Sequence, residues 1–272
     1  MTMIEISLDP IMLKIGSLEL GWYGFFIGLG VLALLAWCMY IVRKERPVFT
    51  VENLLTVTII TIPAAIVGAR LFHIIDYWDY YWQNPSLIWG FEGLAIWGAL
   101  VFGILAILVY CTIVKVNFFK AMDVAVPGIF LAQSIGRFGC LSTGCCFGNP
   151  TSLPFGILYT NPHSHGFSES IALPEGMSLL PTQMFESLFM LAMFFLFALV
   201  LRKRGWPAGI LLLVYAAVYA VWRLILGFMR TNEAVWLGLS QAQLVSVLLI
   251  ILVIPLGYYL IRRHQNNMPV DV

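Results

Sequence analysis

The sequence predicts an all-α membrane protein with seven transmembrane helices, from its composition, the length of its apolar segments and the placement of its charges. Apolar residues make up 61% of the 272-residue chain and charged residues 11%, whereas soluble domains carry about 25% charged residues. This composition excludes disordered, collagen-like and nucleic-acid-binding proteins. We expect one polytopic membrane domain over residues 1–272 and no nucleic-acid partner.

Seven apolar stretches have the length of about 20 residues that a helix needs to cross a hydrocarbon core of roughly 30 Å. They cover approximately residues 22–42, 54–75, 94–114, 122–140, 182–201, 208–229 and 239–261. The first is followed by a charged run at 43–46, which is typical of a stop-transfer segment rather than of a cleaved signal peptide. We therefore expect the N-terminus to remain in the mature protein.

Basic residues are distributed unevenly between the connections of the predicted spans. Ten of the fifteen follow the first, third, fifth and seventh spans: Arg43, Lys44, Arg46, Lys115, Lys120, Arg202, Lys203, Arg204, Arg262 and Arg263. Only Lys14 lies outside the spans on the opposite side. The positive-inside rule then predicts an external N-terminus and a cytoplasmic C-terminus. The polar segment 149–180 becomes an external loop of about 30 residues, and the aromatic run 77–82 also faces outward.

Four arginines, Arg70, Arg137, Arg223 and Arg230, lie within or at the ends of the predicted spans. Each would cost about 2.5–3.5 kcal/mol at the centre of a bilayer, so we expect them to face a protein interior or a wet cavity. A single arginine could instead snorkel or tie helices together. Glu186 is the one carboxylate clearly inside a span, so four positive charges are opposed by one negative charge. The excess of positive charge predicts a binding site for an anion.

The spacing of polar residues places them near one another. Tyr219, Arg223 and Arg230 share one helical face, with the two arginines about 10 Å apart along the axis. Gly227 lies between them and provides either a notch for a ligand headgroup or a point of close helix packing.

A second polar stripe, Gln183 and Glu186, lies near the outer end of the fifth predicted span. The anion available in the outer half of a membrane is a phospholipid phosphate, which arginine can contact through two hydrogen bonds.

The string from Gly136 to Gly148, GRFGCLSTGCCFG, contains four glycines including both ends. Such a segment is a poor lipid-facing helix, and irregular backbone at membrane depth is tolerated where it lines a cavity. The sequence therefore predicts that a broken helix end presents Arg137.

Several of these segments resemble the bacterial prolipoprotein diacylglyceryl transferase family. The shared motifs run in order: ELGWYG with Tyr23, VENLL at 51–55, GARLFH around Arg70, EGLAIWG at 92–98, GRFG with Arg137, PTQMFE at 181–186, and YAVWRLILGFMR at 219–230. The resemblance implies transfer of the diacylglyceryl group of phosphatidylglycerol to the lipobox cysteine of a prolipoprotein, with release of glycerol phosphate. It also implies a multi-pass protein of the bacterial inner membrane, in contact with membrane lipids and the prolipoprotein signal peptide.

Site residues follow from the resemblance together with the polar cluster. The expected catalytic residues are Arg137, Arg223, Tyr23 and Tyr219. The expected phosphatidylglycerol-binding residues are Arg137, Arg230, Glu186, Gln183 and Gly148. No cofactor or metal is expected.

The chain departs from the family pattern at several positions. Trp97 stands where many members have histidine, so no general base for the incoming thiol is identified. An arginine-rich cavity could lower the pKa of that thiol without a histidine. Cys140 and Cys145 replace the usual Asn and Glu of the Arg137 motif, and Gly227 replaces an acid.

Three of the five cysteines, Cys140, Cys145 and Cys146, lie in the glycine-rich turn. One interpretation is a structural disulfide from Cys140 to Cys145 or Cys146. A second is a metal site with His163 or His165, although the spacing matches no common zinc pattern. A third is a redox pair. Structural use is the favoured interpretation, and Cys38 and Cys111 are expected to be small buried hydrophobic residues.

Two other functions remain as alternatives. A membrane thiol–disulfide oxidoreductase would use the three clustered cysteines, but the intramembrane arginines would have no role in that function. A non-enzymatic lipid or anion carrier would use the arginines but would need broken helices in symmetric halves. His73, in the second span, is expected to be a hydrogen-bonded core residue.

Overall fold

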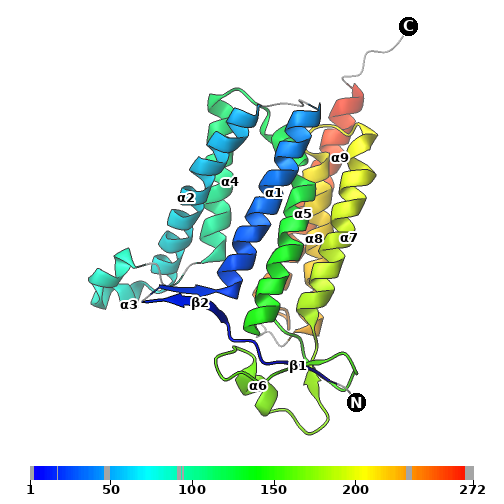
Figure 1. Ribbon diagram of the computed structural model, residues 1–272. Helices are drawn as coiled ribbons and strands as arrows, with labels where there is room; N and C mark the ends of the chain where they lie inside the picture. Colours follow the sequence, from blue (N-terminus) through cyan, green and yellow to red (C-terminus); the bar gives the residue numbers. More distant parts are fainter. Residues whose placement is uncertain are drawn as a thin grey trace. The chain divides into compact units, whose positions relative to one another are not determined.

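A computed structural model describes residues 3–16, 18–45, 50–90, 93, 95–230 and 235–266 (Figure 1). Seven helical segments in these ranges are long and apolar enough to cross a membrane. They are α1 (Trp22–Glu45), α2 (Val51–Asp76), α4 (Ile96–Ile113), α5 (Phe118–Thr143), α7 (Thr182–Leu199) with η2 (Leu201–Arg204), α8 (Ile210–Met229) and α9 (Gln241–Asn266). Every predicted span therefore coincides with a helix.

The chain divides into two compact units, residues 1–37 with 122–272 and residues 38–121. In the second unit, α2 and α4 run side by side (Figure 1). A Cβ atom built on Gly98 would lie 2.1 Å from the carbonyl oxygen of Gly68, so these two helices approach each other at a pair of glycines. Small residues at such a contact are typical of helices that associate in a membrane.

Arg70 lies on α2 and is held within this second unit. Its guanidinium donates hydrogen bonds to the carbonyl oxygens of Leu87, Ile88 and Gly93, with η1 (Pro85–Trp89) supplying the first two. Arg70 therefore fixes a connecting segment, one of the two roles that the sequence left open.

His73 is one turn further along α2. The His73 Nδ1 atom lies 3.2 Å from the hydroxyl of Tyr81 in α3 (Trp78–Gln83), and its ring packs on Tyr77. The hydrogen bond agrees with the expectation, although His73 is half-buried and does not lie in the core.

In the first unit, α1 and α5 are in direct backbone contact. A Cβ atom on Gly30 would lie 2.9 Å from the carbonyl oxygen of Ala132, and one on Gly139 would lie 3.2 Å from the Cα atom of Tyr23. The glycines of α5 therefore let α1 approach closely. This contact sets the position of Tyr23 relative to the last turns of α5.

The core of the first unit joins α5, α7 and α8. Its fully buried members are Val126, Phe130, Met190, Phe197 and Leu211. Ser134 on α5 and Ser187 on α7 exchange hydrogen bonds from each hydroxyl to the other residue's carbonyl, both at 2.9 Å. Because a membrane interior offers no water to such groups, reciprocal bonding satisfies both hydroxyls.

The prediction of an all-α protein was wrong in one respect, because the segments outside the spans contain short strands. A four-stranded sheet has the order β1 (Ile4–Ile6), β5 (Ile157–Tyr159), β6 (Ser178–Leu179) and β4 (Pro150–Thr151). Strands β2 (Ile11–Ile15) and β3 (Leu18–Gly21) form a hairpin, and α6 (Phe167–Ile171) completes the loop between α5 and α7. The chain near the N-terminus thus pairs with the long loop, since β1 is parallel to β5.

The predicted helix break at Arg137 was also wrong. Helix α5 continues through Gly136 and Gly139 to Thr143. In a membrane every backbone group must find a partner, and continuing the helix provides one for each residue. The helix ends at Thr143, and Gly144 follows it with a positive φ of 73°, the left-handed conformation common after a helix C-terminus.

Candidate active site

The centre of the site is a carboxylate shared by two arginines. Arg137 on α5 lies 2.5 Å from Glu186 Oε1, and Arg230, at the end of α8, lies 2.9 Å from Glu186 Oε2. The Glu186 side chain is 1% exposed and that of Arg230 is 5% exposed, while Arg137 retains 19%. A buried carboxylate with an arginine on each oxygen is strongly held in place, and Arg137 is the accessible member of the three.

Two further side chains lie within electrostatic reach of these arginines. Arg137 interacts with Tyr219, and Arg230 with Arg223, both on α8. Three arginines and one glutamate give this cluster a net charge of 3 − 1, or +2. The predicted excess of positive charge is therefore present without Arg70, which belongs to the other compact unit.

Arg230 reaches the cluster from a position that the helical face did not predict. Helix α8 ends at Met229, and Arg230 follows it with extended backbone, φ −115° and ψ 145°. The turn out of the helix brings its guanidinium to Glu186, and its Nε also lies 3.4 Å from Thr182 Oγ1.

Gly227 is a point of close packing rather than a notch. A Cβ atom there would lie 2.4 Å from the side chain of Gln243 on α9, so the glutamine occupies that space. Of the two roles left open for Gly227, the structure supports helix packing.

The first turn of α7 ties the cysteine loop to the cluster. Thr182 donates from its hydroxyl to the carbonyl oxygen of Cys146 at 2.8 Å, and Gln183 donates from Nε2 to the carbonyl oxygen of Cys145 at 2.7 Å. Gln183 Nε2 also lies 3.3 Å from the hydroxyl of Tyr159 in β5. The Gln183 side chain is buried, and its Oε1 has no protein partner. Gln183 Oε1 is therefore an unused acceptor that is enclosed within the protein.

Gly148 lies between the start of α7 and the end of α8. A Cβ atom at this position would be 2.5 Å from the carbonyl oxygen of Met229 and 2.7 Å from the Thr182 methyl group. Its amide donates to the carbonyl oxygen of Leu180 at 2.8 Å. This placement gives Gly148 a packing role, and its contact with a headgroup stays a prediction.

Tyr23, in the first turn of α1, is the remaining predicted site residue of this unit. It interacts electrostatically with Arg137 and with the thiols of Cys140, Cys145 and Cys146, and it is 43% exposed. Tyr23 therefore lies at the accessible side of the cluster.

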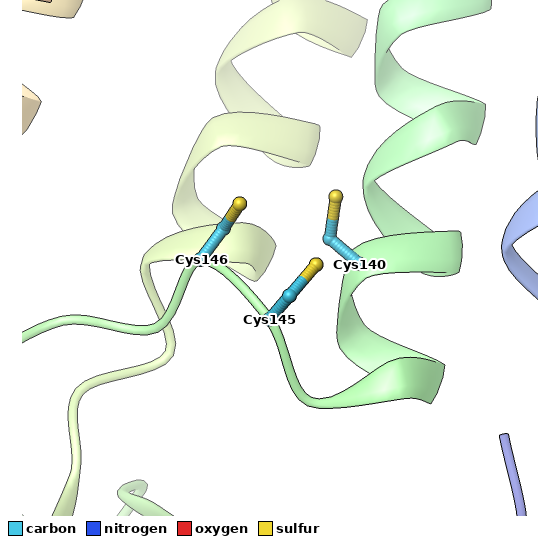
Figure 2. Close-up of side chains that lie close together, drawn as sticks. All are labelled: Cys140, Cys145 and Cys146. Carbon is cyan, nitrogen blue, oxygen red and sulfur yellow. The ribbon is translucent and has the colours of Figure 1, made fainter. Parts of the chain in front are cut away.

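The three cysteines of the glycine-rich turn are free thiols whose sulfur atoms lie within 4.8 Å of one another. Figure 2 shows them converging from the end of α5 and the loop that follows it. Hydrogen bonds from Cys140 and Cys145 lower the pKa of Cys146, and the positive charges of Arg230 and Arg137 lower it further. The structure gives no disulfide between these residues, contrary to the first interpretation.

No histidine among the described residues joins the three thiols. His163 Nδ1 instead lies 3.3 Å from Asp9 Oδ2, and both side chains are exposed. The amide of His165 donates to the carbonyl oxygen of Thr143. The interpretation of a metal site with His163 or His165 is therefore not supported.

Sequence reasoning missed two contributors to the site, Thr182 and Tyr159. Thr182 adjoins the predicted Gln183, so its place at the start of a polar span was the available signal. Tyr159 gave no signal, because its contact depends on how the long loop folds. Trp97, like Arg70, belongs to the other compact unit.

Taken together, these features define a polytopic membrane protein in which buried arginines surround a single carboxylate. A family model described as "Prolipoprotein diacylglyceryl transferase" matches residues 10–259. The chain belongs to this family.

Named relatives cover nearly the whole chain. A phosphatidylglycerol–prolipoprotein diacylglyceryl transferase of Dehalococcoides mccartyi is 40% identical over 264 residues, 97% of this chain and 98% of that protein. Proteins of the same name from Streptococcus uberis and Clostridioides difficile are 31% and 30% identical. Each covers 96% of this chain, which in turn covers 98% and 99% of those proteins.

Proposed function

We infer that this chain transfers the diacylglyceryl group of phosphatidylglycerol to the lipobox cysteine thiol of prolipoproteins and releases glycerol phosphate. It is a transferase of bacterial lipoprotein maturation and a multi-pass protein of the inner membrane. The observation that carries this inference is the pair Arg137 and Arg230 on the single buried carboxylate Glu186, within a chain of this family.

The charge of the cluster suits the reaction. The phosphodiester of phosphatidylglycerol carries one negative charge, and cleavage of its bond to the diacylglyceryl carbon leaves a phosphate monoester that can carry two. A cluster of charge +2 therefore interacts more strongly with the leaving group than with the substrate. The guanidinium group of Arg230 is held in place by Glu186 and Thr182, so it can stabilise the negative charge of the leaving phosphate without reorganising.

Individual roles follow from position. Arg137, the accessible arginine, contacts the phosphate, and Arg230 and Arg223 add positive charge behind it. Gln183 Oε1, which lacks a protein partner, accepts a hydrogen bond from a headgroup hydroxyl. Tyr23 and Tyr219 flank Arg137 and contact the reacting groups, with Gly148 shaping the wall.

The membrane orientation proposed here places the site near the outer leaflet. The N-terminus and the loop 149–180 lie outside and the C-terminus is cytoplasmic, as the ten basic residues in alternate connections favour. Residues 1–272 act as one membrane domain. In this orientation the lipobox thiol would meet phosphatidylglycerol at the outer surface of the membrane.

Neither alternative function is favoured. A thiol–disulfide oxidoreductase or a lipid carrier would leave the family membership and the arginine–carboxylate cluster unexplained. The direct test is whether the purified chain transfers labelled diacylglycerol from phosphatidylglycerol to a lipobox peptide. Absence of labelled peptide with a folded protein would contradict the proposed function.

A further inference from the structure

The thiols of Cys140, Cys145 and Cys146 form a compact cluster at the end of α5 and in the loop that follows it. All three sulfur atoms lie within 4.8 Å of one another, and no other described side chain of metal-binding type joins them. Cys140 is buried, Cys145 is partly buried and Cys146 is exposed. The cluster is therefore least accessible at Cys140, on α5, and most accessible at Cys146, on the loop that follows (Figure 2).

The backbone of the turn holds these thiols together. The amide of Cys145 donates to the carbonyl oxygen of Cys140 at 3.1 Å, which folds the chain back over the end of α5. Gly144 and Cys146 both have left-handed backbone, with φ of 73° and 62°. A non-glycine residue in this region costs about 1 kcal/mol or more. With this backbone, the Cys146 sulfur lies within 4.8 Å of the other two.

Hydrogen bonds from α7 reinforce this turn. Thr182 and Gln183 bind the carbonyl oxygens of Cys146 and Cys145 at 2.8 and 2.7 Å. These carbonyl oxygens are thereby occupied, while the side chains of Thr143 and Arg137 contact the thiols of Cys145 and Cys140. A set of soft ligands fixed by surrounding hydrogen bonds is the construction expected of a metal site.

We propose that Cys140, Cys145 and Cys146 bind one Zn²⁺ ion and leave its fourth position for the lipobox thiol. This rests on the proposed transferase function. With Zn–S bonds of about 2.3 Å, tetrahedral coordination places ligand sulfurs roughly 3.8 Å apart, so the sulfurs need to move by about 1 Å at most from their present separation within 4.8 Å. Three protein ligands with one open position is the arrangement of catalytic zinc sites.

The charges around the cluster favour this occupant. Three thiolates and one Zn²⁺ ion carry a net charge of one negative unit. Arg137 Nη1 lies 3.7 Å from Cys140 Sγ, so a guanidinium group faces the anionic metal–thiolate group. The same contact places the metal beside the arginine that binds the substrate phosphate.

The zinc ion would supply the thiol activation for which the sequence identifies no histidine. A thiol that coordinates Zn²⁺ loses its proton, which is released to solvent. The resulting thiolate attacks the glyceryl carbon, a C–S bond forms, and the bond from that carbon to the phosphate oxygen breaks. The electron pair of the broken bond leaves with glycerol phosphate, so no oxidant or reductant is needed.

Cobalt provides the test, because Co²⁺ occupies zinc sites and has visible absorption. The full chain in detergent is reduced, stripped with a chelator and titrated with Co²⁺. We expect one equivalent to bind, with thiolate-to-cobalt charge-transfer absorption and the intense visible bands of tetrahedral coordination. A lipobox peptide should change this spectrum, and the same peptide with serine in place of its cysteine should not. Zn²⁺ should restore transfer to the stripped protein.

Matched variants locate the site. Cys38→Ala/Cys111→Ala should retain the cobalt spectrum, whereas Cys140→Ser and Cys146→Ser should lose its charge-transfer absorption. Absence of cobalt bands in the unaltered chain, or bands that the lipobox peptide leaves unchanged, would overturn the proposal whether or not the variants fold. Full transfer by stripped protein would overturn it while leaving the transferase function intact. Peptide-responsive cobalt bands without any transfer would support the thiol-binding metal site and count against the proposed function.

Discussion

Arg137 and Arg230 contact opposite oxygens of one carboxylate, although the first lies inside α5 and the second follows the end of α8. Glu186 therefore sets the separation of the two guanidinium groups and limits the repulsion between them. An anion that enters this site meets donors already in position, which is the condition for electrostatic stabilisation of a transition state.

Replacement of the shared carboxylate tests this relationship. Glu186→Gln should lower the free energy of unfolding by about 3–5 kcal/mol, because it leaves two largely buried arginines without their counter-ion. Denaturant unfolding in detergent measures the change. Glu169→Gln, on the exposed surface of α6, is the control and should have little effect. Equal stability of the two variants would contradict a structural role for the shared carboxylate.

Gln183 should contribute to substrate affinity. Gln183→Met keeps the length of the side chain but removes both the free acceptor Oε1 and the donor to Cys145. Loss of such a buried hydrogen bond costs about 1–3 kcal/mol, so the KM for phosphatidylglycerol should rise about tenfold. Tyr159→Phe removes only the hydroxyl that Gln183 contacts and should change KM less. An unchanged KM in Gln183→Met would exclude Gln183 from headgroup binding.

Arg70 should affect stability rather than chemistry. Arg70→Lys cannot reproduce the hydrogen bonds to Leu87, Ile88 and Gly93, because an ammonium group lacks the planar fork. Hydrogen exchange should become faster between Pro85 and Gly90, with transfer per folded molecule unchanged. Loss of transfer without faster exchange would indicate that Arg70 acts on substrate instead.

Membrane orientation can be tested at two positions. In a cysteine-free background, His165→Cys should react with an impermeant maleimide added outside, and Lys203→Cys should react only after the membrane is opened. The reason is the concentration of basic residues in alternate connections, which retains those segments in the cytoplasm. Alkaline phosphatase fusions after residues 165 and 203 give the same information without cysteine replacement. The opposite pattern would place the site at the inner leaflet.

The spans could be predicted from sequence because long apolar runs report directly on helices that cross a membrane. The small sheet could not, since its strands are two or three residues long and pair Ile4 with Ile157 across most of the chain. Pairing over such a separation leaves no local pattern. Tyr159 was missed for the same reason.

Within the site, residue type was more informative than local conformation. The arginines and Glu186 were found because charge is costly in a membrane. The helix break at Arg137 was predicted from glycine propensity, which costs about 1 kcal/mol per residue. The structure shows that contact of Gly139 with Tyr23 and the need to pair backbone groups outweigh that cost. The turn at Arg230 depends on tertiary contacts with Glu186 and Thr182 that spacing does not reveal.

Arg137 gives the sharpest test of the phosphate site. Of the two arginines that contact Glu186, Arg137 is the more exposed, and its guanidinium also lies beside the Cys140 thiol. Removing a charge-assisted contact costs about 1.5–3 kcal/mol of binding, and loss of a donor to the developing charge adds about 10²–10³ in kcat. Arg137→Ala should therefore reduce transfer below detection.

Arg137→Lys should restore only part of this activity, because a point charge cannot bind two phosphate oxygens in the way that a guanidinium does. Arg204→Ala, in the exposed η2 segment, is the matched control and should transfer normally. Transfer of labelled diacylglycerol to a lipobox peptide measures all three variants, with circular dichroism as the folding control. Since Arg137 also pairs with Glu186, a folded Arg137→Ala protein is required for the comparison. Near-normal turnover in that folded protein would remove Arg137 from the phosphate site and leave Arg230 and Arg223 as the charges to test next.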